Sequence, residues 1–235
     1  MIYIITGTSS GIGEALAKFY LKKGNKVIGV SRNNSIDHEN FTHVRCDFTD
    51  KQQLHELALL KHVNAEDYPI CLINNAGIIG DINRTHQLTL THYVDMAMVN
   101  MAAPQFLCSY VLQTFGVENI DTIVNISSGA GERPVPSWGA YCATKAAMDI
   151  FAETLALEFK ELGADTKVFN IAPGVVDTKM QEVIRESGGK RFSSHQNFVD
   201  LKENEELRSP QEVAILLDEF LQEEHPEEEG VIHRI

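Results

Sequence analysis

The chain alternates short, continuously apolar runs with longer stretches in which apolar residues recur at helical spacing. The short runs are rich in β-branched residues, which favour strands. They predict seven strands: Ile2–Thr6, Lys26–Val30, His43–Cys46, Ile70–Asn74, Thr122–Ile126, Lys167–Ile171 and Val231–Ile235. Strands without a polar face are typical of a parallel sheet that is covered on both sides.

The longer stretches predict five helices: Ile12–Lys23, Lys51–His62, Leu90–Phe115, Ala140–Leu162 and Pro210–Glu223. Ser209 is placed to cap the last helix, Pro210 suits its first turn, and Glu212 completes a capping box. The alternation predicts a single doubly wound, Rossmann-type α/β sandwich whose seven-stranded, mostly parallel sheet carries helices on both faces. Because no internal repeat or break in composition occurs, we expect one domain over residues 1–235.

Residues 175–208 interrupt this alternation. The segment is long, contains Gly188 and Gly189, and has only weak helical periodicity. Connections of this length inside a domain usually serve a function, so we predict a mobile lid over a substrate. Its apolar residues could bury an aromatic ligand: Met180, Val183, Ile184, Phe192 and Phe198.

Composition and charge narrow the possible partners. A chain of 235 residues with 43% hydrophobic content can bury a sizeable core, which excludes disorder as its main state. The 33 acidic residues outnumber the 20 Lys and Arg, and the formal net charge of −13 argues against a nucleic acid or an anionic membrane as partner. Acidic clusters at residues 203–206 and 223–229 are interpreted as solvated faces rather than metal sites.

Targeting and redox features indicate the cytoplasm. No apolar run reaches the ~20 residues of a membrane helix, and Met1–Thr6 is typical of a strand rather than a signal peptide. The four cysteines form no CxxC pair and no Cys/His pattern, so we expect neither disulfides nor zinc. The nine histidines are scattered, and none is assigned to a metal.

A glycine-rich turn joins the first strand to the first helix. Gly7, Gly11 and Gly13 let the backbone approach a pyrophosphate closely, and the free N–H groups at the helix start can receive its charge. The spacing is GxxxGxG rather than the more common GxGxxG. By itself the turn leaves two alternatives open, a nucleotide site and a turn whose glycines serve packing alone.

The end of the second strand indicates which dinucleotide is bound. An acid there would bind the ribose 2′-hydroxyl of NAD, but no acid occurs between Ala15 and Ile36. Ser31 and Arg32 stand there instead, and a guanidinium matches the oxygens of a 2′-phosphate. These residues favour NADP(H). The alternative is that Arg32 is an exposed loop residue without a ligand.

Proton chemistry is suggested by Tyr141 and Lys145, which lie four residues apart and therefore on one face of a predicted helix. A free tyrosine has a pKa near 10, and a neighbouring ammonium favours the phenolate and lowers that pKa. Ser127 and Ser128 end the fifth strand. The alternative is that the tyrosine and the lysine are an ordinary helix pair.

Together these motifs resemble the short-chain dehydrogenase/reductase family over essentially the whole chain. The resemblance rests on TGxxxGxG at residues 6–13, NNAG at 74–77, Asn100 in the central helix, a serine after strand five, the YxxxK pair, and Pro173-Gly174 followed by Thr178. The family places its catalytic serine thirteen residues before the tyrosine, which selects Ser128.

The resemblance implies a role for each matching residue. Tyr141 would be the general acid, and Ser128 would bind the substrate oxygen. Lys145 would hold the nicotinamide ribose and lower the pKa of Tyr141, while Asn100 would keep a water in the proton path. The implied cofactor contacts are Gly7, Ser10, Ile12 and Gly13 at the pyrophosphate, Asp47 and Phe48 at adenine, Asn75 at the adenosine ribose, Val176 and Thr178 at the carboxamide, and Gly11, Ala76, Gly77, Pro173 and Gly174 from the same motifs.

Within the family, the stretches 138–148 and 172–181 and the Ser31-Arg32 pair look most like sepiapterin reductases and bacterial benzil reductases. This branch reduces one carbonyl of a vicinal dicarbonyl with NADPH. The resemblance therefore implies a cytoplasmic, NADPH-dependent carbonyl reductase with a small-molecule substrate, assembled as a homodimer or homotetramer. Two alternatives stay open: an NADP-linked alcohol or 3-oxoacyl enzyme of the same family, and a catalytically silent protein that senses dinucleotides.

Overall fold

The computed structural model describes residues 1–225 and 230–235, with every side chain there except those of residues 60 and 65. Its strands are β1 Ile2–Thr6, β2 Lys26–Ser31, β3 Phe41–Arg45, β4 Ile70–Asn74, β5 Ile120–Ile126, β6 Lys167–Ala172 and β7 Ile232–Arg234. They form one sheet in the order β3-β2-β1-β4-β5-β6-β7, and every neighbouring pair is parallel. The predicted fold class is confirmed. The winding reverses between β1 and β4, where such sheets bind ligands.

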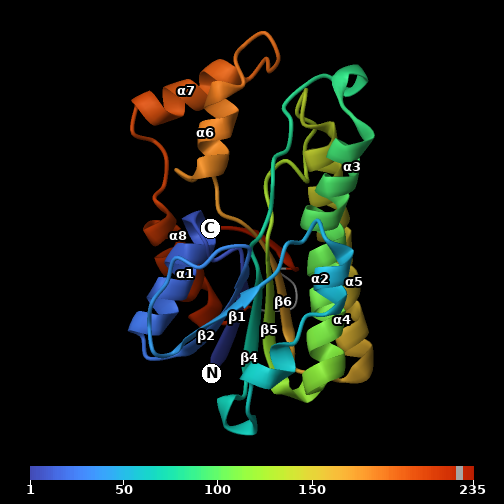
Figure 1. Cartoon of the computed structure of the whole chain (residues 1–235), viewed down its shortest axis with the longest axis vertical. Helices are drawn as coiled ribbons and strands as arrows, with labels where there is room; N and C mark the ends of the chain where they lie inside the picture. The colour runs from blue at the N-terminus through green and yellow to red at the C-terminus, as the bar shows by residue number, and fades with distance from the viewer. Residues whose placement is uncertain (226–229) are drawn as a thin grey trace.

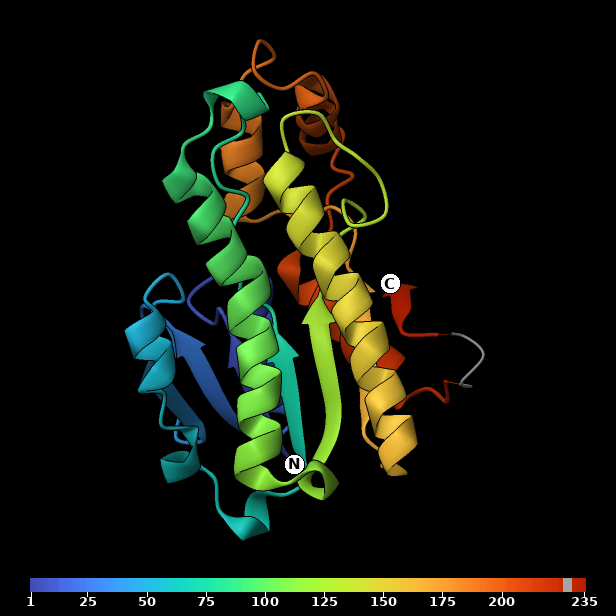
Figure 2. The ribbon, with the colours of Figure 1, turned by 90° about the vertical axis from the view of Figure 1, so that its right-hand side faces the viewer.

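Helices cover both faces of the sheet (Figures 1 and 2). The described helices are α1 Gly11–Lys22, α2 Lys51–His55, α3 Leu90–Ala97, α4 Ala103–Phe115, α5 Gly139–Leu162, α6 Lys179–Glu186, α7 His195–Glu203 and α8 Pro210–Gln222. Figure 1 shows α1 and α8 on one face, α2, α4 and α5 on the other, and α6 and α7 beyond the carboxyl ends of the strands. The lid segment thus contains two helices.

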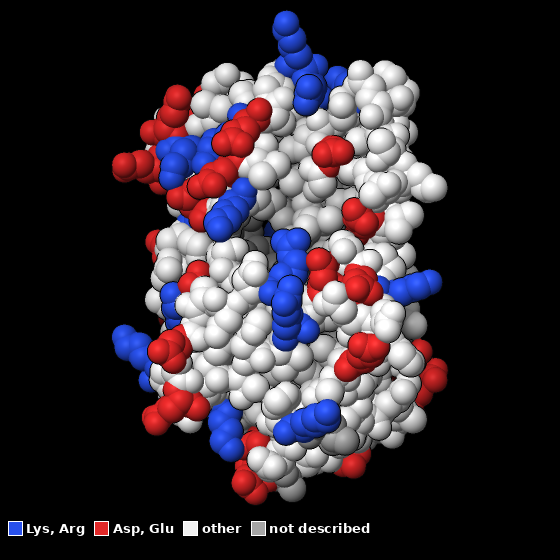
Figure 3. Space-filling model, viewed as in Figure 1, with Lys and Arg blue, Asp and Glu red and all other residues white. Residues whose placement is uncertain are grey.

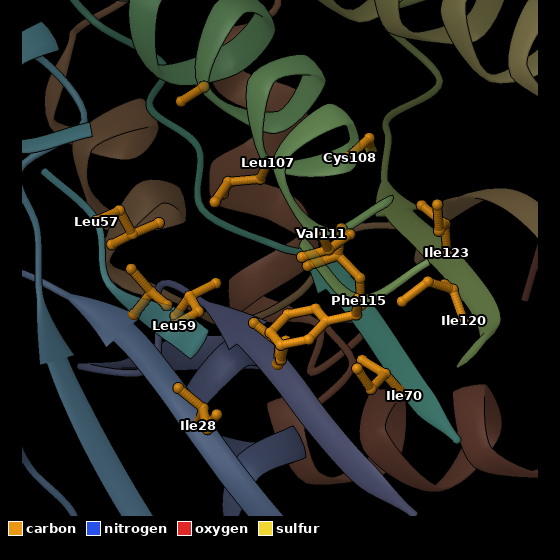
Figure 4. Close-up of a cluster of buried hydrophobic side chains, with 14 of the residues drawn as sticks. Ile28, Leu57, Leu59, Ile70, Leu107, Cys108, Val111, Phe115, Ile120 and Ile123 are labelled. Carbon is orange, nitrogen blue, oxygen red and sulfur yellow. The ribbon is translucent and has the colours of Figure 1, made fainter. Parts of the chain in front are cut away.

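Alternating side chains of the strands supply two cores. Ile2 and Ile4 pack with residues of α4 and α5, whereas Ile5 packs with residues of α1 and α8. Figure 4 shows the first core, in which Val111 and Phe115, four residues apart on α4, lie over the sheet. Each such side chain contributes about 1.5–3 kcal/mol by leaving water. Apolar residues on both faces therefore hold the sheet between two helical layers.

The predicted helix Lys51–His62 is wrong in its second half. The α-helix ends at His55, and a 3₁₀ turn follows at Leu59–His62. Leu54, Leu57 and Leu59 are all buried. Since an α-helix advances about 100° per residue, Leu57 and Leu59 would point about 200° apart in one helix. Burying both side chains requires the break.

The predicted helix Leu90–Phe115 is not one regular α-helix. A π-helical turn, Met98–Ala102, separates α3 from α4, and Pro104 follows it. Proline has no N–H to donate, and its ring pushes away the carbonyl four residues earlier, which here belongs to Asn100. The turn therefore sits at a residue that the sequence assigned to the site.

The start of the last helix agrees with the sequence. Ser209 caps α8, and Glu212 bonds back to the Ser209 N–H, which completes the predicted capping box. Of the acidic cluster at 223–229, residues 226–229 lie outside the described part of the chain. None of the described helices combines the length and the hydropathy that crossing a bilayer needs.

Candidate active site

A cleft of about 510 Å³ opens at the carboxyl ends of the central strands. Figure 3 shows a hollow in this face between the part with α6 and α7 and the rest, with Lys and Arg side chains along its rim. The structure brings nearly all the predicted site residues to this cleft: Gly7, Ser10, Gly11, Ile12, Ser31, Arg32, Asp47, Phe48, Asn75, Ala76, Gly77, Ser128, Tyr141, Lys145, Pro173, Gly174, Val176 and Thr178. Gly13 and Asn100 are not among the residues that line it. Ile78, Asp95 and Lys179 also line it, although no sequence motif marks them.

The glycine loop is shaped by contact with the end of β4. A Cβ on Gly13 would overlap Asn75 Nδ2 and lie 2.5 Å from the carbonyl oxygen of Gly7. Gly7 itself has a φ of +75°, which favours glycine. The Asn75 and Ala76 N–H groups donate to Thr6 Oγ1 at 2.9 Å, and Asn75 Nδ2 donates to the Thr6 carbonyl at 2.8 Å. These bonds join the two loops into one rigid floor.

The start of α1 is open toward the cleft. Ser10 occupies the N-cap position, but its side chain makes no capping hydrogen bond. The first N–H groups of the helix therefore have no side-chain acceptor in the described structure, and the positive end of the helix dipole faces the same space. An anion such as a pyrophosphate fits a floor of this kind, since no side chain stands between it and the backbone donors.

Ser31 and Arg32 have different surroundings at the end of β2. Ser31 is buried, and its hydroxyl donates to the Asn33 carbonyl at 2.8 Å and lies 3.2 Å from His43 Nε2. Arg32 is exposed at the cleft and forms no ion pair with the described residues. At this position the Arg32 guanidinium is therefore available to bind a ligand, whereas the Ser31 hydroxyl is already hydrogen-bonded within the protein. No sequence motif marks His43, because only the pairing of β3 with β2 brings its ring beside Ser31.

Ser128, Tyr141 and Lys145 meet at the far end of the cleft. Burial raises the pKa of Tyr141 to about 12, and a hydrogen bond with Ser128 lowers it in part. Burial lowers the pKa of Lys145 to about 8, against the charge of Asp149, which raises it. Lys145 Nζ donates to the Ile126 carbonyl at 2.7 Å and lies 5.8 Å from the Tyr141 ring centre. At neutral pH Tyr141 therefore keeps its proton, and Lys145 is mostly charged.

Asn100 uses its side chain to hold the loop after β4. Its Oδ1 accepts from the Ile78 N–H, and its Nδ2 donates to the Ile78 carbonyl, both at 2.8 Å. A longer bond of 3.4 Å reaches Thr144 Oγ1 on α5. The side chain is therefore engaged within the protein, and the water expected at Asn100 stays a prediction.

A cluster of aromatic side chains packs beside Tyr141. Trp138 stacks on Phe192 of the lid at 5.1 Å between ring centres, and it meets the Tyr141 ring edge-on at 5.6 Å. Phe198 lies 5.4 Å from the same indole. Of the other predicted lid residues, Met180 lines the cleft and Ile184 is buried, but Val183 is 46% exposed and lies on the solvent side. The predicted lid segment is thus held to the start of α5 by contacts of Trp138 with Phe192 and Phe198.

Known proteins resemble this chain along most of its length. A family model described as short chain dehydrogenase matches residues 1–188. Benzil reductase ((S)-benzoin forming) of Bacillus subtilis (strain 168) is 35% identical over 218 residues, which cover 91% of this chain and 90% of that protein. Sepiapterin reductase of Xenopus tropicalis is 37% identical over 125 residues, or 49% of this chain and 44% of that protein. Both belong to the branch that the sequence resembles, so that prediction is confirmed.

Solved structures agree with the fold. The YIR035C short chain dehydrogenase/reductase from Saccharomyces cerevisiae superposes with a TM-score of 0.86 and 27% identity. The superposition covers 99% of this chain and 95% of that one. The similarity therefore includes the segments that carry the glycine loop, the Tyr141 helix and the lid.

Proposed function

The chain belongs to the short-chain dehydrogenase/reductase family of oxidoreductases, and we propose that it is an NADPH-dependent carbonyl reductase acting on a vicinal dicarbonyl. The observation that carries this proposal is the pair of Tyr141 and Ser128. Both side chains line a cleft whose floor fits a dinucleotide, and they lie close enough for the Ser128 hydroxyl to lower the pKa of Tyr141. Two donors that converge on one point suit the oxygen of a carbonyl group.

Ser128, Tyr141 and Lys145 each have a separate role in the proposed reaction. When bound, NADPH supplies the hydride that reduces the carbonyl carbon. Ser128 binds the substrate oxygen and orients it toward Tyr141. Tyr141 donates its phenolic proton to that oxygen as negative charge develops there, because its raised pKa keeps the proton available at neutral pH. Lys145 places an ammonium beside the phenol and stabilises the phenolate that remains.

Arg32 supports NADPH as the cofactor. Its guanidinium lies at the cleft and forms no ion pair with any described residue, so it is available to bind the 2′-phosphate. In Arg32→Asp, we expect the ratio of kcat/KM for NADPH to that for NADH to fall roughly 10- to 100-fold, the factor that corresponds to a charged hydrogen bond of about 1.5–3 kcal/mol. Initial rates with each cofactor measure the ratio. Arg84→Asp, an exposed arginine outside the cleft, is the matched control. Equal efficiency with both cofactors in the parent protein would contradict the proposal.

The apolar lining of the cleft supports the substrate class. Ile78, Val99 and Met180 give the cleft apolar walls for a flat ligand, and an adjacent carbonyl group makes hydride attack easier by withdrawing electrons. The likeness to benzil reductase and sepiapterin reductase points the same way. We therefore propose an aryl α-diketone or a pterin side-chain diketone as the kind of substrate.

A panel of carbonyl compounds tests this proposal. Initial rates of NADPH oxidation are compared at matched low concentration for benzil, sepiapterin, a simple aldehyde and an acetoacetyl thioester. We expect the two dicarbonyls to react at least about tenfold faster than the others, since their pocket contacts contribute to transition-state binding. Preference for the thioester would assign a 3-oxoacyl reductase. Tight NADPH binding without turnover of any compound would favour a dinucleotide sensor.

We also propose that the protein acts on small molecules in the cytoplasm as a homodimer or homotetramer. Exposed apolar side chains on α5, Ile150 and Leu157, support an oligomer. The four free thiols support a reducing compartment. The net charge of −13 argues against nucleic acid and anionic membranes as partners.

A further inference from the structure

A buried carboxylate lies behind the catalytic groups on the same helix. Asp149 follows Lys145 by one turn of α5, is only 7% exposed, and does not line the cleft. Its Oδ1 accepts a hydrogen bond from Ser127 Oγ at 2.9 Å and another from Asn170 Nδ2 at 2.6 Å. Both donors hold this carboxyl group in one position inside the protein. Burying an acidic group is costly, and the proposed reaction does not use it directly.

Asp149 contacts both ends of the loop that carries Ser128. Ser127, its hydrogen-bond donor, directly precedes Ser128. At the other end of the loop, a Cβ on Gly131 would overlap Asp149 Oδ2 and lie 3.1 Å from the Lys145 carbonyl carbon. The Gly131 N–H closes the loop by donating to the Ser128 carbonyl at 2.9 Å. The position of Ser128 is therefore set by a loop packed on this carboxylate.

The same carboxylate helps to join α5 to the end of β5. Lys145 Nζ bonds to the carbonyl of Ile126, and Asp149 bonds to the hydroxyl of the next residue, Ser127. Because Lys145 and Asp149 are four residues apart, they lie on one face of the helix. Two bonds to consecutive residues at the end of β5, Ile126 and Ser127, fix both the position and the rotation of α5 against the sheet. Because Tyr141 lies one turn before Lys145 on the same helix, its position is fixed as well.

A row of buried amides holds Asp149 from the sheet side. Asn74, Asn125 and Asn170 lie in register on β4, β5 and β6. Asn74 Nδ2 donates to Asn125 Oδ1 at 3.0 Å, and Asn170 Nδ2 donates to Asp149. Asn170 therefore ties the carboxylate to β6, and Ser127 ties it to the chain that follows β5.

We propose that Asp149 is a positioning residue of the active site, which fixes the Ser128 loop against α5 and supplies the countercharge to the Lys145 ammonium. This rests on the proposed function, in which Ser128 and Lys145 take part. Within the described part of the chain, the charged group that acts with Asp149 is Lys145 on its own helix, and its hydrogen-bond donors are Ser127, directly after β5, and Asn170 on β6. The other charged pair near the loop is the exposed Glu132–Arg234 bridge to β7. The charge of Asp149 raises the pKa of Lys145, which burial lowers to about 8.

The pH dependence of NADPH binding tests the countercharge. In the wild-type protein Lys145 is charged below about pH 8 and neutral above it, so the affinity for NADPH weakens as the pH rises through about 8. In Asp149→Asn the ammonium loses its countercharge, and we expect this midpoint to fall by about one pH unit. Quenching of protein fluorescence by NADPH between pH 6 and 10, in the absence of any carbonyl substrate, measures it. Glu153→Gln, an exposed carboxylate one turn further along α5, is the matched control and keeps the wild-type midpoint.

Ser127→Ala separates the two roles, because it removes the loop contact and leaves the charge in place. We expect kcat for the preferred dicarbonyl to fall about tenfold in this variant, with an unchanged pH midpoint for NADPH. In Asp149→Asn we expect both a lower kcat and a shifted pH midpoint for NADPH binding. If Asp149→Asn does not fold, kcat and the pH midpoint of NADPH binding are measured for Asp149→Ser, which also removes the charge.

Three outcomes would overturn the proposal or its premise. An Asp149→Asn midpoint equal to that of the wild type and of Glu153→Gln removes the countercharge role. A wild-type kcat in Ser127→Ala removes the loop role. A wild-type protein that binds NADPH but reduces no carbonyl contradicts the proposed function instead, while the binding midpoint still tests the countercharge.

Discussion

Replacing Tyr141 with Phe is expected to lower kcat for carbonyl reduction by about 10²–10⁴-fold, the range that a general acid contributes. The phenylalanine ring fills the same space beside Trp138 and removes only the hydroxyl, whose raised pKa makes it a proton donor at neutral pH. The affinity for NADPH should stay within about twofold, since the floor of the cleft is unchanged. Loss of NADPH absorbance measures the rate, and fluorescence quenching measures the affinity.

Tyr110→Phe is the control for this substitution. Tyr110 lies on α4, does not line the cleft, and loses the same hydroxyl. It should keep the wild-type kcat. If Tyr141→Phe also retained near-wild-type turnover, the proton would have another source, and the role of Tyr141 in the proposed function would be wrong.

Gly13→Ala is expected to lower both the affinity for NADPH and the stability of the fold. The new methyl group would overlap Asn75 Nδ2 and lie 2.5 Å from the Gly7 carbonyl oxygen. Neither group can move freely, because Thr6 ties both loops together through three hydrogen bonds. We expect a loss of about 1–3 kcal/mol in the free energy of unfolding, typical of overpacking, and a loss of about 10²-fold in affinity from a displaced glycine loop.

Gly139→Ala provides the comparison for Gly13→Ala. Gly139 begins α5, and the nearest atom to a Cβ there is Thr85 Oγ1 at 3.9 Å. Alanine favours a helix over glycine, so this variant should unfold at the same or a slightly higher temperature. Thermal unfolding and NADPH titration measure both variants. If Gly13→Ala kept the wild-type unfolding temperature and NADPH affinity, the floor of the cleft would be able to move aside for the methyl group. That result would contradict the rigid floor inferred from its hydrogen bonds.

The lengths of two helices could not be predicted from apolar periodicity. Leu54, Leu57 and Leu59 are all apolar, and the sequence does not tell which of them face the sheet. The structure buries all three, which a single helix cannot do. At Met98–Ala102 the π turn depends on Pro104 and on the bonds from Asn100 to Ile78, which lies 22 residues away in the chain.

The sequence by itself determined the fold class, the family and the positions of Tyr141, Lys145 and the glycine loop. Each of these depends on residues close together in the chain, since strand runs, a strand-to-helix turn and an i, i+4 helix pair are local patterns. Only the tertiary structure decided which polar side chains are free for a ligand. The Ser31 hydroxyl is engaged by Asn33 and His43, and Asp149 gains its place from Ser127 and Asn170. Apart from Asn33, these partners come from distant parts of the chain, and they meet only when parallel strands pair in register and α5 packs on them.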